Sequence, residues 1–591
     1  MGVSIKEHGK PARYYAWGHP TGNNCTVAKG VDALRKAVKN KHGVVCHNGK
    51  FDGDVAETHL GVTWPWDKTH DTMILAYLID PHSKVIDLKP LSERYLDMPP
   101  SERDAVRDWL IANKIVTKVM KNWGAYISKA PGDLVGEYAN GDTIRTEQLF
   151  QLFYPRVVEV DMIDAYRREI RLLPVLLRAE REGVAVDAKK LRADVTTYTA
   201  AITQVDEMIG KLLRMKNLNV DSDTDLADAI ERRFPGRDWV LTPTGQRSTS
   251  KENLKAVITN KPLLAMLTYR ASVMTCLNTF MQPWLLTASD ADACGRIYTY
   301  WNSTAQDKGG GSRTGRLSST PNFQNIPTLK SPKFVDAIEY HARYLSDKGL
   351  PALPQVRSYI VADTKQDVLC DRDFSQQELR VLAHFEDGAM MRGYLENPRL
   401  DLHDYARQVI KDNVGLELTR KDTKNIAFGL LYGMGLGSLA EKLGLTVDEA
   451  RTTRNAYLNT FPGIKLISSD LKMRAQNDLP MRTWGGRLYY VEPPKIIDGK
   501  LRSFEYKLFN YLIQGSSADI TKEAILAYDE LRRDGHLRLT VHDELLISVP
   551  KKAWRGEMEL LRRAMENVPL DVPLLSDGGV GYRWTELKEV K

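Results

Sequence analysis

The feature that most constrains the fold of this chain is a strand-like segment near its C-terminus that is interrupted by charge. Residues 537–549 form two apolar runs that meet at His542, Asp543 and Glu544. Charged side chains in the middle of a buried strand are energetically costly, unless the chain bends there and the carboxylates bind a cation. The pattern therefore predicts a hairpin bend whose carboxylates face a cation, and it requires a partner elsewhere in the chain.

Asp373 is the candidate partner. It follows an apolar segment of strand character at 367–370 and precedes a clustered apolar face at 379–385 that favours a helix. A carboxylate at a strand-to-helix junction has a fixed backbone and an open side, which suits a metal site. For either aspartate alone, a solvated residue at a strand end is the simpler interpretation. Together, Asp373 and Asp543 could be the shared ligands of a two-metal site.

A second group consists of Arg420, Lys424, Phe428 and Tyr432, which recur at intervals of four residues. In a helix each step of four turns the side chain by only about 40°, so all four share one stripe. Such a stripe can neutralise a triphosphate at one end and stack on a base at the other. The spacing fits an ordinary amphipathic helix with a basic face equally well.

Length and composition set the broad class. A chain of 591 residues should divide into two to four domains, and 42% hydrophobic with 27% charged residues is typical of a globular protein. No apolar run is long enough to span a membrane, and the N-terminus lacks a signal-peptide pattern. The net charge of +7 permits a polyanionic partner without establishing one. The scattered cysteines, which predict reduced thiols in a cytoplasmic protein without zinc or disulfides, are Cys25, Cys46, Cys276, Cys294 and Cys370.

The order of patterns along the chain predicts a multidomain protein of α/β and α+β type. Residues 1 to about 155 alternate strand and helix patterns, beginning with a hairpin at 3–16, and residues 160–290 are mostly helical. The polar stretch at 308–327 could be a linker, but its closely spaced polar side chains look placed for contact. From 355 to 575 strands and helices return, with a turn-rich stretch at 480–500.

Three motifs in this order resemble those of family A DNA polymerases, the family of the Klenow fragment. Residues 373–380 resemble motif A, residues 420–433 resemble motif B, and residues 542–544 resemble motif C. Further similar stretches lie at 314–327, 461–464 and 510–515, so the resemblance spans about residues 165–590. One such motif would be weak, but three ordered motifs with intact spacing are strong.

This resemblance implies a right-hand polymerase domain at 160–591. Its thumb would lie at about 165–290, its palm at about 295–385 and 500–591, and its fingers at about 386–499. A supporting role near the metals would fall to Glu544, and Lys424 could protonate the pyrophosphate leaving group. The implied metal ligands are Asp373 and Asp543, holding two Mg²⁺ ions for which Mn²⁺ could substitute. The implied nucleotide-binding residues are Arg420, Lys424, Phe428, Tyr432, Glu378 and Gln376.

The resemblance also implies contacts to primer-template DNA. Minor-groove acceptors look alike for every correct base pair, so such contacts check geometry without reading sequence. Two departures stand out: the stretch around Thr320 and Pro321 is one residue short, and Tyr506 stands where the Klenow-type pattern has an arginine, so no minor-groove contact is expected from it. The implied DNA-binding residues are Arg316, Asn322, Gln324, Asn325, Asn510, Gln514 and His542.

Glu378 has two interpretations. In the form Ser375-x-x-Glu378 it fits a helix capping box, which is purely structural. In the family this glutamate is the steric gate against a ribose 2′-hydroxyl, and it argues against the related single-subunit RNA polymerases. The surrounding motif favours the gate.

The N-terminal region resembles the family's RNase H-like 3′–5′ exonuclease domain, over residues 1–155. Asp52 would be a metal ligand from the second motif, and Tyr138 and Asp142 would come from the third. The first motif, a strand bearing Asp-x-Glu, is absent, so we expect an inactive, vestigial domain. The sequence does not decide between a shortened chain and a natural late start, and no 5′-nuclease domain precedes this region.

These observations predict a template-directed DNA polymerase acting in replication or repair, without proofreading. Its expected partners are primer-template DNA and deoxynucleoside triphosphates, and we expect a monomer without membrane attachment, in the cytoplasm of a bacterium or a phage-infected cell. A processivity factor stays open. The alternatives are a non-catalytic nucleic-acid-binding scaffold, which would be expected to have lost Asp373 or Asp543, and a standalone exonuclease, which the missing first motif disfavours.

Overall fold

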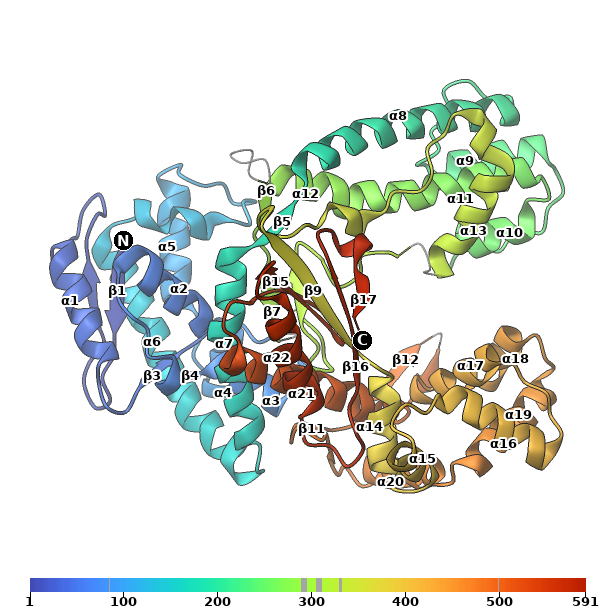
Figure 1. Cartoon of the computed structure of the whole chain (residues 1–591). Helices are drawn as coiled ribbons and strands as arrows, with labels where there is room; N and C mark the ends of the chain where they lie inside the picture. The colour runs from blue at the N-terminus through green and yellow to red at the C-terminus, as the bar shows by residue number, and fades with distance from the viewer. Residues whose placement is uncertain (84, 289–294, 305–310, 329–331, 498, 591) are drawn as a thin grey trace.

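The computed structural model of the chain is shown in Figure 1 and describes all residues except 84, 289–294, 305–310, 329–331, 498 and 591. Four hydrophobic clusters form its interior: three lie mainly within the first 170 residues, and one large cluster runs from Leu172 to Trp584. None of the helices among the described residues is long and apolar enough to cross a membrane.

The N-terminal region alternates strands and helices, as predicted. The expected hairpin is present as β1 (Gly2–Ile5) and β2 (Arg13–Ala16), which pair antiparallel. A second, parallel pair consists of β3 (Val44–Cys46) and β4 (Thr69–Asp71). The helices of this region are α1 (Val27–Val38), α2 (Gly49–Leu60), α3 (Thr72–Ile79), α4 (Leu88–Leu96), α5 (Ser101–Ala112) and α6 (Gly132–Glu159).

Residues 163–287 are mostly helical, which confirms that expectation. After α7 (Ile163–Glu182), the chain forms an elongated arm at the top right of Figure 1. Core residues of α8 and α11 hold the arm together, in the same cluster that fills the centre of the molecule. The helices of the arm are α8 (Ala188–Leu213), α9 (Asp223–Arg233), α10 (Lys251–Val257), α11 (Lys261–Cys276), α12 (Gln282–Thr287) and α13 (Pro332–Tyr340).

A five-stranded antiparallel sheet lies at the centre of the molecule, in the order β14-β15-β9-β16-β17. The predicted break in the strand-like segment at 537–549 is a hairpin between β14 and β15, and the strand predicted before Asp373 is β9. Helix α22 (Trp554–Glu566) packs on this sheet, and α21 (Lys507–Leu531) packs against α22. The strands are β9 (Asp367–Phe374), β14 (His536–Val541), β15 (Glu544–Pro550), β16 (Ser576–Gly581) and β17 (Lys588–Val590).

Seven helices between β9 and residue 476 form a second lobe, at the lower right of Figure 1. The stretch at 480–500, expected to be rich in turns, also contains strands: β10 (Met481–Arg482) pairs with β11 (Leu488–Tyr489), and β12 (Lys495–Ile497) pairs with β13 (Lys500–Arg502). The lobe contains α14 (Gln377–Glu386), α15 (Ala389–Glu396), α16 (Leu402–Val414), α17 (Arg420–Leu431), α18 (Leu436–Leu443), α19 (Val447–Thr460) and α20 (Gly463–Gln476).

The part of the 308–327 stretch that the structure describes, from residue 311 onward, is not a linker. Residues 318–320 form β8 (Ser318–Thr320), which pairs with β7 (Tyr300–Asn302). Phe323 and Ile326 are buried in the central hydrophobic cluster. Residues 308–310 and Cys294 lie outside the described residues, and the other four cysteines are free thiols.

Candidate active site

Asp373 and Asp543 lie next to each other at one end of the central sheet. Asp373 is near the end of β9, and Asp543 belongs to the two-residue loop between β14 and β15. The register sets Glu544 opposite Asp373, and the N–H of Phe374 donates to the carbonyl of Asp543 at 3.3 Å. His542, the other loop residue, has a φ of 61°, which lets the chain reverse direction in two residues. The predicted bend and its predicted partner are therefore together.

The electrostatics of this cluster favour a bound cation. Desolvation and the charges of Asp543, Glu544 and Asp371 raise the pKa of Asp373, although water still reaches its side chain and screens part of the repulsion. Desolvation raises the pKa of Asp543 to about 6. The pKa of Asp371 rises to about 7, through desolvation and the charge of Glu544. Carboxylates that repel one another in this way offer hard oxygen donors of the kind that bind divalent cations. Among the described residues, no group of three or more His, Cys, Asp or Glu side chains is arranged to hold a metal ion by itself.

Glu544 is held by two residues that the motif search did not identify. The Trp584 indole donates to one carboxylate oxygen at 2.6 Å, and the Arg357 guanidinium donates to the other at 3.3 Å. The guanidinium carbon of Arg357 also lies 4.0 Å from the centre of the Trp584 ring. With both oxygens engaged, Glu544 is positioned beside Asp373. Neither Arg357 nor Trp584 lies near Glu544 in sequence, so no local spacing could have revealed this contact.

The predicted stripe is a helix with its charged residues toward the N-terminus. Thr419 caps α17 through a capping box with Asp422, which fixes where the helix begins. Arg420 pairs with Asp401 at 2.7 Å, whereas Lys424 is exposed, 5.6 Å from the centre of the Phe428 ring. Tyr432 falls at the C-cap of α17, one residue beyond the helix.

The aromatic end of the stripe meets Glu378. The rings of Phe428 and Tyr432 stack with their centroids 5.9 Å apart and an interplanar angle of 9°. The Tyr432 hydroxyl donates to one oxygen of Glu378 at 3.0 Å, and Arg316 donates to the other at 2.6 Å. Desolvation and the charge of Glu378 raise the pKa of Tyr432 to about 12, so its hydroxyl stays a donor. Residues from three separate motifs thus converge here.

The capping-box interpretation of Glu378 is wrong. Helix α14 begins after Gln376, which has a φ of 55°, and no side chain caps it. The Ser375 hydroxyl instead hydrogen-bonds Asp577. The carboxylate of Glu378 turns outward to Arg316 and Tyr432, because the left-handed turn at Gln376 separates Ser375 from the helix.

Several residues that were predicted to contact nucleotide or DNA form hydrogen bonds within the protein instead. The amide of Gln376 donates to Leu400 and accepts from Tyr394, which leaves the predicted nucleotide contact without geometric support. Gln324 is buried and donates to the carbonyl of Thr540 at 2.6 Å. Asn322 accepts from the N–H of Asn325, whose own side chain is exposed. Both glutamines hold the backbone around the site.

The remaining predicted DNA contacts line α21 and the hairpin loop. Asn510 and Gln514 stand one turn apart on α21, and both are half-buried. The side-chain oxygen of Asn510 has no partner among the described residues. His542 is exposed, and its pKa is lowered by desolvation and by the charges of Arg316 and Arg357, so it is neutral at physiological pH. These groups leave donors and acceptors available to a ligand.

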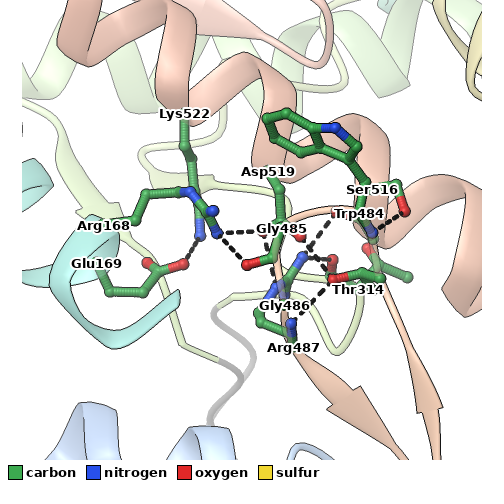
Figure 2. A network of polar contacts seen from close by, with 12 residues as sticks. Arg168, Glu169, Thr314, Trp484, Gly485, Gly486, Arg487, Ser516, Asp519 and Lys522 are labelled. Carbon is green, nitrogen blue, oxygen red and sulfur yellow. Dashed lines mark hydrogen bonds and ion pairs between the residues drawn. The ribbon is translucent and has the colours of Figure 1, made fainter. Parts of the chain in front are cut away.

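A buried network fixes the loop that carries Arg316 (Figure 2). Arg487 is 2% exposed, and its guanidinium donates to Asp519, to the carbonyl of Thr314 and to the carbonyl of Gly515, at 2.8, 2.9 and 2.8 Å. A Cβ at Gly315 would come within 1.8 Å of this guanidinium, so the residue before Arg316 must be glycine. Arg487 thereby sets Arg316 and the adjacent turn of α21 at fixed positions.

The same network connects α7 to α21. Lys522 donates to Glu169 at 2.5 Å, with both side chains 1% exposed, and Arg168 donates to the carbonyl of Gly485 at 2.9 Å (Figure 2). A buried charge without its partner is strongly destabilising. The paired charges therefore favour one arrangement of α7 against the helix that carries Asn510 and Gln514.

The three residues predicted from the exonuclease-like motifs, Asp52, Tyr138 and Asp142, have different surroundings from those of Asp373 and Asp543. Lys89 forms an ion pair with Asp142, and its Nζ lies 4.5 Å from the centre of the Tyr138 ring. Asp52 is in the first turn of α2, and desolvation and the charge of Asp71 raise its pKa to about 7. Lys89 thus supplies a positive charge to Asp142, and the Asp52 carboxyl faces Cys46 and Asp71 instead. Of the two metal ligands predicted here, Asp142 is therefore neutralised by a lysine, and Asp52 lies beside the carboxylate of Asp71.

Comparison with known proteins agrees with these motifs. A family model described as DNA polymerase family A matches residues 188–586, and one described as 3′-5′ exonuclease matches residues 19–157. The thermostable DNA polymerase I of Thermus filiformis is 28% identical over 538 residues, which cover 88% of this chain and 56% of that protein. The chain spans about half the length of such bacterial relatives.

Two further matches cover nearly the whole chain. DNA polymerase DpoZ of Vibrio phage phiVC8 is 26% identical over 606 residues, covering 93% of this chain and 88% of the phage protein. Among solved structures, the POL domain of Pol1 from M. smegmatis in complex with DNA primer-template and dNTP matches with a TM-score of 0.76 and 23% identity. That match covers 98% of this chain and 91% of the mycobacterial one, and it shows that the two share a fold.

Proposed function

Because the chain belongs to DNA polymerase family A, we propose that it is a DNA-directed DNA polymerase, which extends a primer 3′-hydroxyl along a template and releases pyrophosphate. The observation that carries this proposal is the convergence of three distant segments. Asp373 and Asp543 meet at the end of the sheet, and Glu378 meets Tyr432 at the end of α17. The thumb at 165–290, the palm at 295–385 and 500–591 and the fingers at 386–499 stay our domain assignment.

The carboxylates of Asp373 and Asp543 would hold divalent metal ions, and we propose Mg²⁺. When bound, such ions neutralise phosphate charge and lower the pKa of the attacking hydroxyl. Asp373 and Asp543 position these charges at the end of β9, and Glu544, held by Arg357 and Trp584, keeps a third carboxylate fixed beside them. Phosphoryl transfer depends mainly on positioning and charge stabilisation, so rigid ligands matter more than reactive ones.

The charged end of α17 would receive the triphosphate. Lys424 is exposed and has no ion-pair partner among the described residues, so its ammonium is available to the phosphates and can donate a proton to the leaving pyrophosphate. Arg420 is paired with Asp401 on the surface, and a triphosphate would compete for its guanidinium. Phe428 and Tyr432 present stacked rings toward the sugar and base.

Glu378 would select the sugar. Arg316 and Tyr432 hold both of its oxygens, so the carboxylate cannot swing aside to admit a ribose 2′-hydroxyl. An added hydroxyl would then meet a fixed, already satisfied carboxylate and lose its own hydration without compensation. Arg316 thereby serves both DNA binding and sugar selection.

The exonuclease-like domain would not proofread. Its Asp142 is neutralised by Lys89, and Asp52 lies beside the carboxylate of Asp71. We propose that this domain has a supporting role, since Lys50 in its second motif donates to the carbonyl of Trp301 in the polymerase portion, at 2.6 Å. We place the protein in the cytoplasm as a monomer that binds primer-template DNA.

Primer extension tests the proposal. The purified chain, given a labelled primer-template, Mg²⁺ and all four deoxynucleotides, should extend the primer to the template end, and a single deoxynucleotide should be added only opposite its complement. Absence of extension would contradict the polymerase assignment and favour a binding scaffold. Labelled single-stranded DNA in the same buffer should stay intact, and its degradation from the 3′ end, if abolished by Asp142→Ala, would contradict the inactive exonuclease.

A further inference from the structure

The short hairpin of β12 and β13 presents a basic face on one side and an exposed apolar face on the other. In β12 and β13, Lys495 lies opposite Arg502, Ile496 opposite Leu501, and Ile497 opposite Lys500. Side chains alternate between faces along a strand, so three cations share one face with Ile497. The other face consists of Ile496 and Leu501, which are 76% and 72% exposed.

Repulsion between like charges on the basic face destabilises the hairpin. Like charges directly opposite each other in an antiparallel pair repel, and Lys495 and Arg502 occupy such a position. Within the described part of the chain, no carboxylate forms an ion pair with Lys495, Lys500 or Arg502. Counted from the sequence alone, residues 495–502 carry three basic residues and one acid, a net charge of +2. An anion between the opposed cations would relieve this repulsion.

The root of the hairpin is rigid and lies against the candidate active site. Glu492, which is 5% exposed, pairs with Lys507 at 2.9 Å and with Arg313 at 3.2 Å, so the two ends of the hairpin are fastened together. Tyr506 follows the hairpin, and its ring occupies the space that a Cβ on Gly433 would fill, at 2.5 Å. Gly433 is next to Tyr432, so the segment that follows the hairpin packs against the C-terminal end of α17.

We propose that the hairpin of β12 and β13 binds the unpaired template strand ahead of the primer terminus. This inference rests on the proposed polymerase function. A single strand that passes around the edge of the hairpin can set its phosphates against the cations on one face and its exposed bases against Ile496 and Leu501 on the opposite face. Duplex DNA hides its bases in the stack, so it satisfies the basic face alone. A polyanionic single strand therefore fits both faces together.

The test compares binding to primer-templates that share one duplex and carry a template overhang of either one or eight nucleotides. Wild-type full-length chain should bind the longer overhang more tightly, as measured by fluorescence anisotropy. The variants Ile496→Ser/Leu501→Ser and Lys495→Gln/Arg502→Gln should each reduce that gain by about tenfold, since burial of apolar side chains against bases and contacts to phosphates are each worth a factor of about this order. The second variant should also lower the salt dependence of the gain.

Matched controls come from α20. Leu466 is 73% exposed and Lys472 is exposed on the same helix, so Leu466→Ser/Lys472→Gln makes the same chemical changes away from the hairpin. It should bind as wild type does. An overhang gain that is unchanged in both hairpin variants would overturn the proposal and leave these faces to a protein partner. An equal loss on both substrates would also overturn it, because the hairpin would then contact duplex.

Incorporation of one nucleotide on the one-nucleotide overhang separates this inference from the proposed function. The hairpin variants should keep the wild-type rate there, because their residues lie outside the proposed catalytic machinery. Failure of wild type to incorporate would contradict the polymerase assignment itself, whereas normal incorporation with an unchanged overhang gain contradicts the hairpin alone.

Discussion

The aspartates at the end of the central sheet and the predicted metal-binding aspartates of the N-terminal domain differ in the partners that surround their carboxylates. At the end of the central sheet, Asp373 and Asp543 lie together with Glu544, and their pKa values are raised by desolvation and by the charges of neighbouring carboxylates. In the N-terminal domain, Asp142 is paired with Lys89. The N-terminal group is only partly compensated, because desolvation and the charge of Asp71 raise the pKa of its Asp52 to about 7. At the sheet end, no lysine or arginine among the described residues forms an ion pair with Asp373 or Asp543, and we propose the metal site there.

A second aspartate of the N-terminal domain makes the same point through the backbone. Asp71 accepts hydrogen bonds from the N–H groups of Asn48, Gly49 and Met73, at 3.1, 2.7 and 2.8 Å. It caps α3 and fixes the start of α2, so its acceptor capacity is used for folding. By contrast, Asp373 has no hydrogen-bond donor to its side chain among the residues the structure describes.

The largest expected effect comes from exchanging one carboxylate in each group. Asp373→Asn should lower the rate of primer extension on the order of a thousandfold or more, because a neutral amide cannot hold the catalytic cation. Asp52→Asn, the matched change in the N-terminal domain, should leave the rate unchanged. Single-turnover extension with saturating DNA measures both. Comparable losses in the two variants would remove the distinction between the groups.

The next effect concerns the sugar. Glu378→Ala should raise the efficiency of ribonucleotide relative to deoxynucleotide incorporation at least about tenfold, since it removes the carboxylate that Arg316 and Tyr432 hold in place. The ratio of kcat/KM for the two sugars measures this. Gln376→Ala, two residues away, is the control and should keep the wild-type ratio, because its amide is engaged inside the protein. An unchanged ratio in Glu378→Ala would count against the gate.

A smaller effect comes from the residues that hold Glu544. Trp584→Phe removes the indole donor and keeps the ring under Arg357, so extension should fall about fivefold through loss of one hydrogen bond. The concentration of Mg²⁺ that gives half-maximal rate should rise with it, whereas the KM for primer-template should not. If Trp584→Phe changed only the melting temperature, Trp584 would have a purely structural role, and its hydrogen bond to Glu544 would not matter for extension.

The smallest effect is on stability in the absence of metal. Desolvation and neighbouring carboxylates hold the folded pKa values of Asp373, Asp371 and Asp543 above the ordinary value of an aspartate, and Asp373→Asn removes the first of these titrating groups. The folded state therefore keeps protons that the unfolded state loses, and stability that is present at acidic pH declines as the pH rises through these values. In chelator, the melting temperature should drop by about 1–3 °C more between pH 5.5 and 8.5 in wild type than in Asp373→Asn.

Added Mg²⁺ should reverse that drop in wild type and should not do so in Asp373→Asn. Asp164→Asn, at a side chain that is 87% exposed on α7, provides the control and should follow wild type. A pH dependence that is identical in all three proteins would show that the carboxylates at the sheet end do not repel one another appreciably.

Much of this arrangement could be predicted from sequence, because the signals were local. The hairpin break at Asp543, the strand before Asp373 and the helical stripe from Arg420 each follow from a pattern within a dozen residues. The capping box at Ser375 failed, since sequence spacing cannot report the left-handed turn at Gln376 that displaces it. The short hairpins after residue 480 were missed because charged residues and prolines hide their alternation.

Residues that act across the fold could not be found this way. Arg357 and Trp584 lie far from Glu544 in the chain, and Arg487 supports Arg316 through a network that closes only when α21 and the 311–316 loop meet. The ion pair of Lys89 with Asp142 could not be predicted either, because nothing in the exonuclease-like motifs specifies a lysine at that place. These contacts depend on tertiary packing, which has no periodicity to detect.

Counting bound metal ions tests most directly whether metal binds at the sheet-end aspartates and not at those of the N-terminal domain. Mn²⁺, followed by electron paramagnetic resonance in the presence of primer-template and a non-hydrolysable deoxynucleotide, should bind wild type and Asp52→Asn alike. Binding should be lost from Asp373→Asn and from Asp543→Asn. Retention of full Mn²⁺ binding by both sheet-end variants, or its loss from Asp52→Asn, would contradict the account.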